Sequence, residues 1–186
     1  MVEKLKTEHR AEVEWRPFYL RPDTPPEGIE LPAYVRARMA STQERLKQMA
    51  RGAGMEMVFP PRLPNTRLAH EATEYARAHG KHEEFHRIVF RLYYGEGQNI
   101  SRWEVLRMAT QKVGLDPDEM RREVESGRYV ATVQGQIATA QALGITGVPT
   151  YILDDKYAVV GAQPYEVFQR VMARLAAEMR EQPQEE

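Results

Sequence analysis

The sequence contains no cysteine among its 186 residues. This absence excludes a structural disulfide, a cysteine ligand for zinc and a thiolate nucleophile supplied by this chain. It fits a reducing compartment. A chain of this length buries roughly 70% of the surface that its unfolded form exposes, so its core needs neither a disulfide nor a metal.

A strong charge of one sign and long apolar runs are absent as well. The net charge is -1, so the composition predicts neither nucleic acid nor a membrane as a partner. No apolar run approaches the ~20 residues of a membrane span. The first residues, Met1 to Lys6, lack the apolar centre of a secretory signal. We therefore expect a cytoplasmic globular protein.

Local patterns predict the structure of three segments in the first 144 residues. Val2 to His9 is expected to be the end of a helix. Ala11 to Leu20 is expected to be a strand, because Val13 and Trp15 alternate with charged residues. From Ser41 to Gly144 the sequence is expected to be almost wholly helical.

Residues typical of helix ends recur along the helical stretch. Ser41 and Ser101 are each followed three residues later by glutamate, the spacing of a capping box. Asp116 precedes Pro117 and is expected to cap a helix. The expected helix stops are Gly80, Gly114, Gly127 and Gly144. Two apolar stripes are expected in the core: Phe85, Ile88, Val89, Leu92 and Tyr93, and then Phe168, Val171, Met172, Leu175 and Met179.

The stretch from Gly147 to Leu153 is the most informative part of the chain. Pro149 stands at the entrance to a β-branched and aromatic run, the strand position that proline tolerates. A proline in such a tight entry is also a candidate for a cis peptide bond. A polar turn, a second strand from Tyr157 to Val160, and a helix from Tyr165 follow.

These segments resemble the C-terminal half of a thioredoxin fold of the DsbA-like family. The segments Glu14–Phe18 and Val159–Pro164 are most similar to its FrnE-type dithiol oxidoreductases. The resemblance implies an α/β fold in which an all-helical domain is inserted into a thioredoxin-like domain. Residues 1–30 and 145–182 would form the thioredoxin-like domain, and residues 31–144 the inserted helical domain.

The chain departs from the family pattern ahead of the predicted Ala11–Leu20 strand. The family has a first strand, a Cys-x-x-Cys motif and a helix there, and only the end of that helix matches this sequence. We therefore expect an incomplete thioredoxin-like domain that is redox-inactive as given. It would be either a truncated copy of an oxidoreductase or a non-catalytic relative that binds peptides or thiols, so whether it is an enzyme stays open.

The resemblance also implies a binding groove beside Pro149. There the backbone would bind an extended peptide or a small thiol such as glutathione. The predicted site residues are Gly147, Val148, Pro149, Thr150, Gly161, Ala162, Gln163 and, more loosely, Asn65. No catalytic residue, metal ligand or cofactor is predicted.

Two other functions have partial support in the sequence. The 2-hydroxychromene-2-carboxylate isomerases and kappa-type glutathione transferases resemble this group, but the position where they use serine is not in this chain. His82, Glu83 and His86 match the zinc hydrolase pattern H-E-x-x-H, with Glu104 as a possible third ligand. However, the pattern stands at a helix start, where acidic residues complement the helix dipole. The remaining histidines are expected at the surface: His9, His70 and His79.

The missing first strand has a consequence for assembly. In the family that strand lies between the strands that correspond to Ala11–Leu20 and Thr150–Leu153. Without it, two strand edges face water, and such edges recruit strands from other chains. A closed twofold pair is the commonest soluble arrangement. We therefore expect a homodimer.

Overall fold

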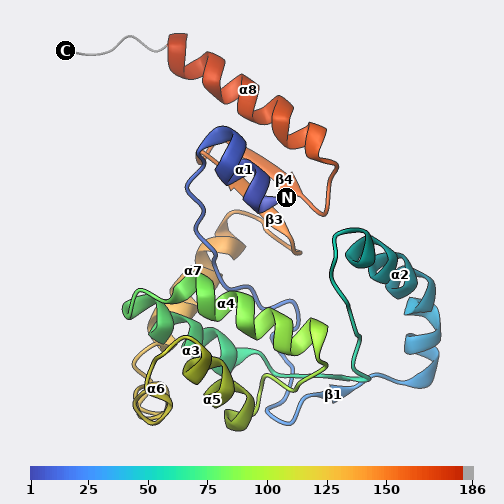
Figure 1. Cartoon of the computed structure of the whole chain (residues 1–186), viewed down its shortest axis with the longest axis vertical. Helices are drawn as coiled ribbons and strands as arrows, with labels where there is room; N and C mark the ends of the chain where they lie inside the picture. Colours follow the sequence, from blue (N-terminus) through green and yellow to red (C-terminus); the bar gives the residue numbers. More distant parts are fainter. Residues whose placement is uncertain (182–186) are drawn as a thin grey trace. The chain divides into compact units, whose positions relative to one another are not determined.

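The structure is a computed structural model that describes residues 1–181. The chain forms two compact units (Figure 1). One comprises Met1–Leu20 together with the chain from Ile137 on, and is called the hairpin unit here. The other, Arg21–Gln136, is called the helical unit. The predicted domain boundaries at residues 30 and 144 stay a prediction, and residue 182 lies outside the described residues.

The hairpin unit is built on two short antiparallel strands. They are β3 (Thr150–Leu153) and β4 (Tyr157–Val160), with Thr150 paired to Val160 and Leu153 paired to Tyr157. Asp154 and Asp155 in the connecting turn have φ of 52° and 50°, a region that aspartate enters more readily than most residues. The unit also contains the helices α1 (Val2–His9), as the sequence predicts, and α8 (Tyr165–Glu181).

One face of the hairpin carries the core of this unit. Leu5 of α1, Val159 of β4 and Phe168 of α8 are buried together, and the rings of Tyr151 and Phe168 meet edge to face at 4.8 Å. The expectation that Met179 belongs to the core is wrong, because its side chain is 67% exposed. A helix the length of α8 extends well past strands of four residues, so its last turns do not pack against the hairpin.

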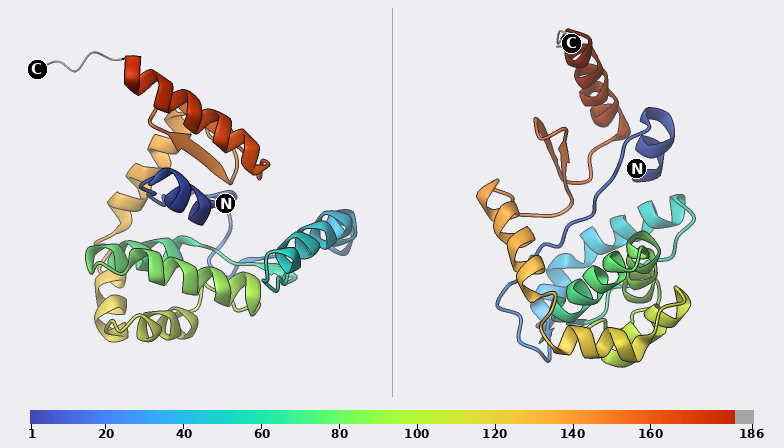
Figure 2. Two further views of the ribbon diagram at one scale, coloured as in Figure 1. Left: turned by 45° about the horizontal axis from the view of Figure 1, so that its top comes forward. Right: turned by 90° about the vertical axis from the view of Figure 1, so that its left-hand side faces the viewer.

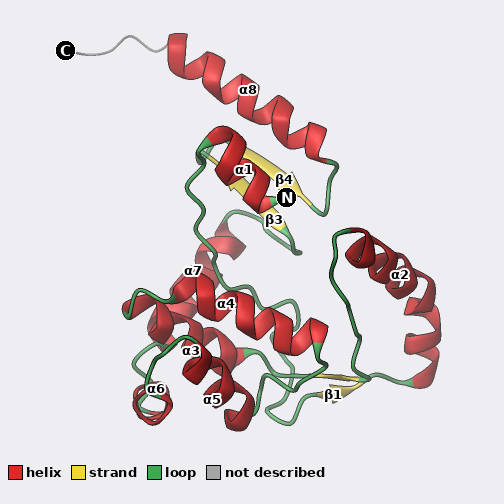
Figure 3. Cartoon of the chain, in the orientation of Figure 1, coloured by secondary structure: helices red, strands yellow, loops and turns green. Residues whose placement is uncertain are grey.

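The helical unit contains most of the helices (Figure 3). Its elements are β1 (Ile29–Glu30), α2 (Ala33–Gly52), β2 (Arg62–Leu63), α3 (Arg67–Ala78), α4 (His82–Phe90), the π-helix η1 (Arg91–Gly95), α5 (Trp103–Lys112) and α6 (Pro117–Glu125). The helix α7 (Val130–Ala142) crosses the boundary between the units. Helices α3 to α6 enclose the main core, which includes Phe85, Val89 and Leu92 of the first predicted stripe.

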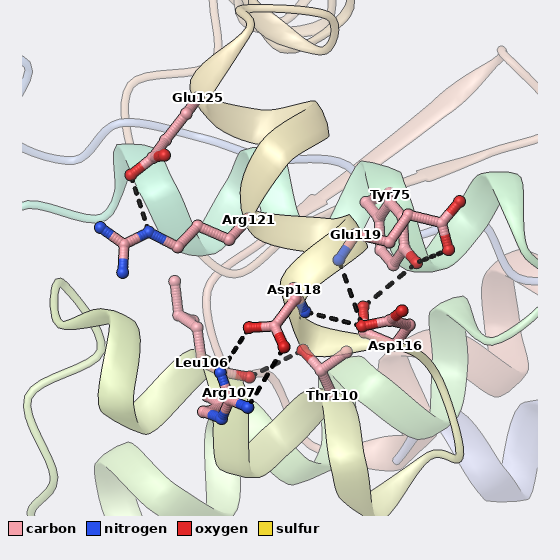
Figure 4. A network of polar contacts seen from close by, with 9 residues as sticks. All are labelled: Tyr75, Leu106, Arg107, Thr110, Asp116, Asp118, Glu119, Arg121 and Glu125. Carbon is pink, nitrogen blue, oxygen red and sulfur yellow. Dashed lines mark hydrogen bonds and ion pairs between the residues drawn. The ribbon is translucent and has the colours of Figure 1, made fainter.

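A polar network fixes the start of α6 (Figure 4). The Asp116 carboxylate accepts hydrogen bonds from the backbone N–H groups of Asp118 at 2.8 Å and Glu119 at 3.2 Å. These two hydrogen bonds, of which the one from Glu119 has the larger effect, hold the pKa of Asp116 below its usual value. Arg107 bonds to Asp118 at 2.6 Å, and the Tyr75 hydroxyl donates to the Glu119 carboxylate at 3.3 Å. The predicted cap at Asp116 is confirmed.

The predicted strand at Ala11–Leu20 is wrong. This segment belongs to no strand and forms no ladder with any of residues 1–181. Its alternation of apolar and charged residues is real, since Val13 and Trp15 are half-buried. A strand also needs a neighbouring strand to satisfy its N–H and C=O groups, and alternation within one segment cannot supply that neighbour.

Both predicted capping boxes are also wrong. Helix α2 begins at Ala33, well before Ser41, and α5 begins at Trp103 with Arg102 as its cap residue. The Ser101 hydroxyl donates instead to the Asn99 side chain at 2.7 Å. The predicted glycine stops are confirmed, with φ from 69° to 79° at Gly80, Gly114, Gly127 and Gly144. No helix within residues 1–181 is long and apolar enough to cross a lipid bilayer.

Candidate functional site

Two turns meet at one end of the β3–β4 hairpin. The first, Gly147–Thr150, leads into β3, and the second, Gly161–Gln163, leaves β4. The Gly161 N–H donates to the Pro149 carbonyl at 2.8 Å and so joins the two turns. The structure therefore brings together all of the predicted site residues except Asn65.

Local hydrogen bonds shape each turn. In the first, the Thr150 hydroxyl donates to the Gly147 carbonyl at 2.7 Å. In the second, the Gln163 side-chain amide donates to the Val160 carbonyl at 2.9 Å. Gly161 has a φ of 82°, which favours glycine. The Val148–Pro149 peptide bond is cis, and the Val148 side chain is 54% exposed.

The outer edge of β3 is available to a further strand. The carbonyls of Pro149 and Leu153 face β4 or its turn, where they accept bonds from Gly161 and Lys156. Because successive residues of a strand point their backbone groups in opposite directions, those of Thr150 and Ile152 point away from β4. Within the described residues the sheet has only these two strands, so nothing there pairs with this edge.

The open face of the hairpin adjoins that edge. Thr150 pairs with Val160 and Ile152 with Ala158, so these four side chains share the face opposite the Phe168 core. Ile152 is 40% and Val160 61% exposed. The β4 residues of this face were not among the predicted site residues, because Tyr157 to Val160 are all apolar and the sequence alone does not show which of them face outward.

The chemistry of the site is that of a binding surface. The residue types of the two turns carry no group that titrates near neutral pH. Tyr151 of β3 is on the covered face, where burial raises its pKa. What the site offers a ligand is therefore backbone N–H and C=O groups beside exposed apolar side chains.

Asn65 has a local role in the helical unit. Its side-chain amide donates to the Thr24 carbonyl at 2.6 Å, and its side-chain oxygen accepts from the Arg67 N–H at 2.9 Å. It thereby ties the loop around Thr24 to the start of α3. These contacts use both the nitrogen and the oxygen of the Asn65 side-chain amide, so its position is explained without a ligand.

The H-E-x-x-H pattern does not form a metal site. The His82 Nε2 atom lies 2.8 Å from the guanidinium of Arg77. The positive charge of Arg77 thus occupies the place where a metal ion would have to bind. The His86 ring stacks on Phe90 at 4.4 Å. Burial first, and the neighbouring His82 second, lower the pKa of His86 to about 4. No three His, Asp or Glu side chains within residues 1–181 gather around a common point.

The family of the chain follows from comparison with known proteins. The family model of the DSBA-like thioredoxin domain matches residues 1–173, so the chain belongs to this family. The uncharacterized protein YwbO of Bacillus subtilis (strain 168) is 31% identical over 166 residues, which cover 88% of this chain and 82% of YwbO.

Solved structures show the same fold. A probable DsbA oxidoreductase, SCO1869 from Streptomyces coelicolor, superposes with a TM-score of 0.81 at 24% identity, covering 92% of this chain and 77% of its own. A 2-hydroxychromene-2-carboxylate isomerase gives a TM-score of 0.77 at 19% identity, covering 96% and 88%. The predicted α/β thioredoxin-like fold, rich in helices and with a small sheet, is confirmed.

Proposed function

We propose that this chain is a peptide-binding member of the DSBA-like family. An extended peptide adds as a third strand to the outer edge of β3. The chain performs no thiol–disulfide exchange through its own side chains, because that exchange requires a thiolate and the chain has no cysteine. The segments Glu14–Phe18 and Val159–Pro164 favour the FrnE-type branch of the family over the isomerase branch.

The free edge of β3 is the observation that carries this proposal. Strand addition gains affinity from main-chain hydrogen bonds and specificity from alternate side chains. Thr150 and Ile152 offer the backbone groups. Every second side chain of the added strand then packs beside Ile152, on the open face with Val160. The site therefore favours extended segments with β-branched or aromatic residues at alternate positions. A small thiol with a peptide backbone, such as glutathione, would engage only the turn at Val148.

A matched pair of proline variants tests strand addition. Ile152→Pro removes an N–H that points away from β4, while Ala158→Pro removes the equivalent N–H on the far edge of β4. Neither variant removes a β3–β4 hydrogen bond. The probe is a fluorescein-labelled ten-residue peptide in which valine alternates with threonine, followed by anisotropy.

The two variants should differ clearly. With Ile152→Pro we expect the dissociation constant to rise at least tenfold, and with Ala158→Pro less than twofold. Equal effects of the two variants, or no binding of the peptide by the unmodified chain, would contradict strand addition at β3. Glutathione, titrated separately, reports on the turn alone.

A reduction assay tests the redox part of the proposal. Purified protein, freed of small thiols, should not accelerate the reduction of insulin by dithiothreitol above the rate without protein. A family member with a Cys-x-x-Cys motif, run in parallel, shows that the assay responds. Clear turnover by this chain would show that a group other than a cysteine thiolate carries electrons.

A further inference from the structure

Helix α2 is barely buried for its length. Of its 20 residues only Ala50 is buried, and the side chains of Tyr34 and Met49 are 76% and 57% exposed. Among the described residues of the helical unit, no other helix or strand packs extensively against it, and Figure 1 and the left view of Figure 2 show it lying apart from α3 to α6. Because most helices in proteins depend on packing for their stability, a helix this exposed indicates a surface that a partner covers.

The least exposed positions of α2 form one stripe. They recur every three or four residues, the spacing of one face of an α-helix, and are Val35, Met39, Gln43, Leu46 and Ala50, with the half-buried Lys47 at the edge of the stripe. At 3.6 residues per turn, Arg36 and Lys47 flank this stripe on one side, and Arg38 and Arg45 flank it on the other. The helix thus presents a mainly apolar stripe between two basic borders.

Within the part of the chain that the structure describes, the cations of α2 have no carboxylate partner. The helix has five basic residues and one acidic residue, Glu44, although the whole chain has a net charge of -1. Elsewhere in the unit arginines pair with carboxylates, as Arg107 does with Asp118 at 2.6 Å and Arg121 with Glu125 at 2.9 Å. Within residues 1–181 no ion pair neutralises the following side chains of α2: Arg38, Arg45, Lys47 and Arg51.

We propose that α2 docks an acidic amphipathic helix of another protein. A helix with its own apolar stripe and glutamate or aspartate borders would cover the stripe of α2 and neutralise both basic borders. Methionine and arginine, which recur on α2, and tyrosine, which it carries at Tyr34, are enriched at protein interfaces. A second copy does not fit, because α2 packed on α2 would bring like charges together. A phosphate surface would pair with the cations but leave the apolar stripe uncovered.

The absence of cysteine makes a site-specific test possible. In Met49→Cys, an environment-sensitive acrylodan label reports on α2 alone, and Gln111→Cys on α5 places the same label on an exposed site elsewhere in the unit. The probe is an 18-residue peptide with leucine at helical three- and four-residue spacing and glutamate at the other positions. We expect a saturable blue shift from the α2 label and none from the α5 label.

Charge variants show whether the borders of α2 act specifically. The α2 variant combines Arg38→Glu, Arg45→Glu and Lys47→Glu. The control changes the net charge equally on exposed side chains elsewhere in the unit by Arg21→Glu, Lys112→Glu and Arg122→Glu. At 50 mM salt the dissociation constant of the peptide should rise at least tenfold with the α2 variant and less than threefold with the control.

Several outcomes would overturn the docking proposal. The first is an equal rise in the dissociation constant of the peptide in the two triple variants. The second is an α2 label whose emission does not shift when the peptide is added. The third is binding to vesicles with 30% phosphatidylserine, or to a 20-base-pair DNA duplex, that is tighter than binding to the peptide. If the α2 variant has lost its helical circular dichroism, the glutamine version of the same triple variant replaces it, with the same expected direction. None of these outcomes depends on the β3 edge, so this test is independent of peptide binding there.

Discussion

His70 illustrates how much one side chain depends on its surroundings. Burial above all, and the neighbouring His86 to a smaller extent, lower the pKa of His70 to about 4. The expectation that His70 lies exposed at the surface is wrong, because its side chain is half-buried. A histidine between Ala69 and Glu71 does not reveal by itself which side chains surround it in the fold. Asp116 is the opposite case, because its capping role depends on the next three residues and can be read from them.

The low pKa of His70 predicts a loss of stability in mild acid. The folded state holds this imidazole neutral, while in the unfolded chain its pKa is near 6.5. Between pH 6.5 and 4 the unfolded state therefore binds more protons, so stability is fully present above pH 6.5 and falls as the pH drops toward 4. For His70 alone the loss from pH 7 to pH 5 is about 2 kcal/mol.

Urea unfolding at pH 7 and pH 5 measures this loss. The variant His70→Gln should lose less stability over that range than the unmodified chain. The exposed His79, changed to glutamine, serves as the matched control for a histidine-to-glutamine substitution. A pH dependence that stays the same in His70→Gln would assign the acid sensitivity to other groups.

At the scale of elements, the hairpin unit depends on one layer of contacts. Phe168 of α8 is fully buried, and Tyr151 and Val159 of the two strands pack in the same core. The opposite face of the hairpin is open. Almost all of the apolar contact that holds β3 and β4 in place therefore comes from a single side.

Phe168→Ala should destabilise the hairpin unit selectively. Removing a buried phenylalanine ring costs about 3–5 kcal/mol, and the main core of the helical unit is formed by other residues. Hydrogen exchange of the β3 and β4 amides should accelerate strongly, while exchange in α3 to α6 should change little. Met179→Ala on the exposed end of α8 should leave both unaffected. Equal acceleration in the two units would show that they unfold as one.

The elements differ in how far the sequence could predict them. Helix ends with glycine and the cap at Asp116 depend on local residues, and these predictions are confirmed. The hairpin follows from two β-rich runs joined by a short polar turn. The strand at Ala11–Leu20 depends on a neighbour that alternation cannot reveal, and the exposure of α2 depends on which other helices pack against it. Local chemistry is thus readable from the sequence, and pairing between distant segments is not.

For the whole molecule, the free edge of β3 bears on assembly. The edge that would accept a peptide can equally accept the same edge of a second copy. Antiparallel pairing of two β3 strands about a twofold axis would give a four-stranded sheet and satisfy the outward backbone groups of Thr150 and Ile152 in both copies. The exposed side chains of Val148, Ile152 and Val160 would lie within or beside such an interface. Self-association and peptide binding would then compete.

We therefore propose that the chain forms a homodimer through β3. Size exclusion with light scattering at 50 µM should give twice the monomer mass, with Ile152→Pro monomeric and Ala158→Pro still dimeric. An excess of the valine–threonine peptide should convert the dimer into a one-to-one complex of chain and peptide, because both occupants need the same N–H and C=O groups. A monomer at every concentration would contradict the dimer, and peptide binding would then be the proposed role of the outer edge of β3. A dimer that survives Ile152→Pro would assign the contact to another surface, since proline at that position removes the N–H on which β3 pairing depends.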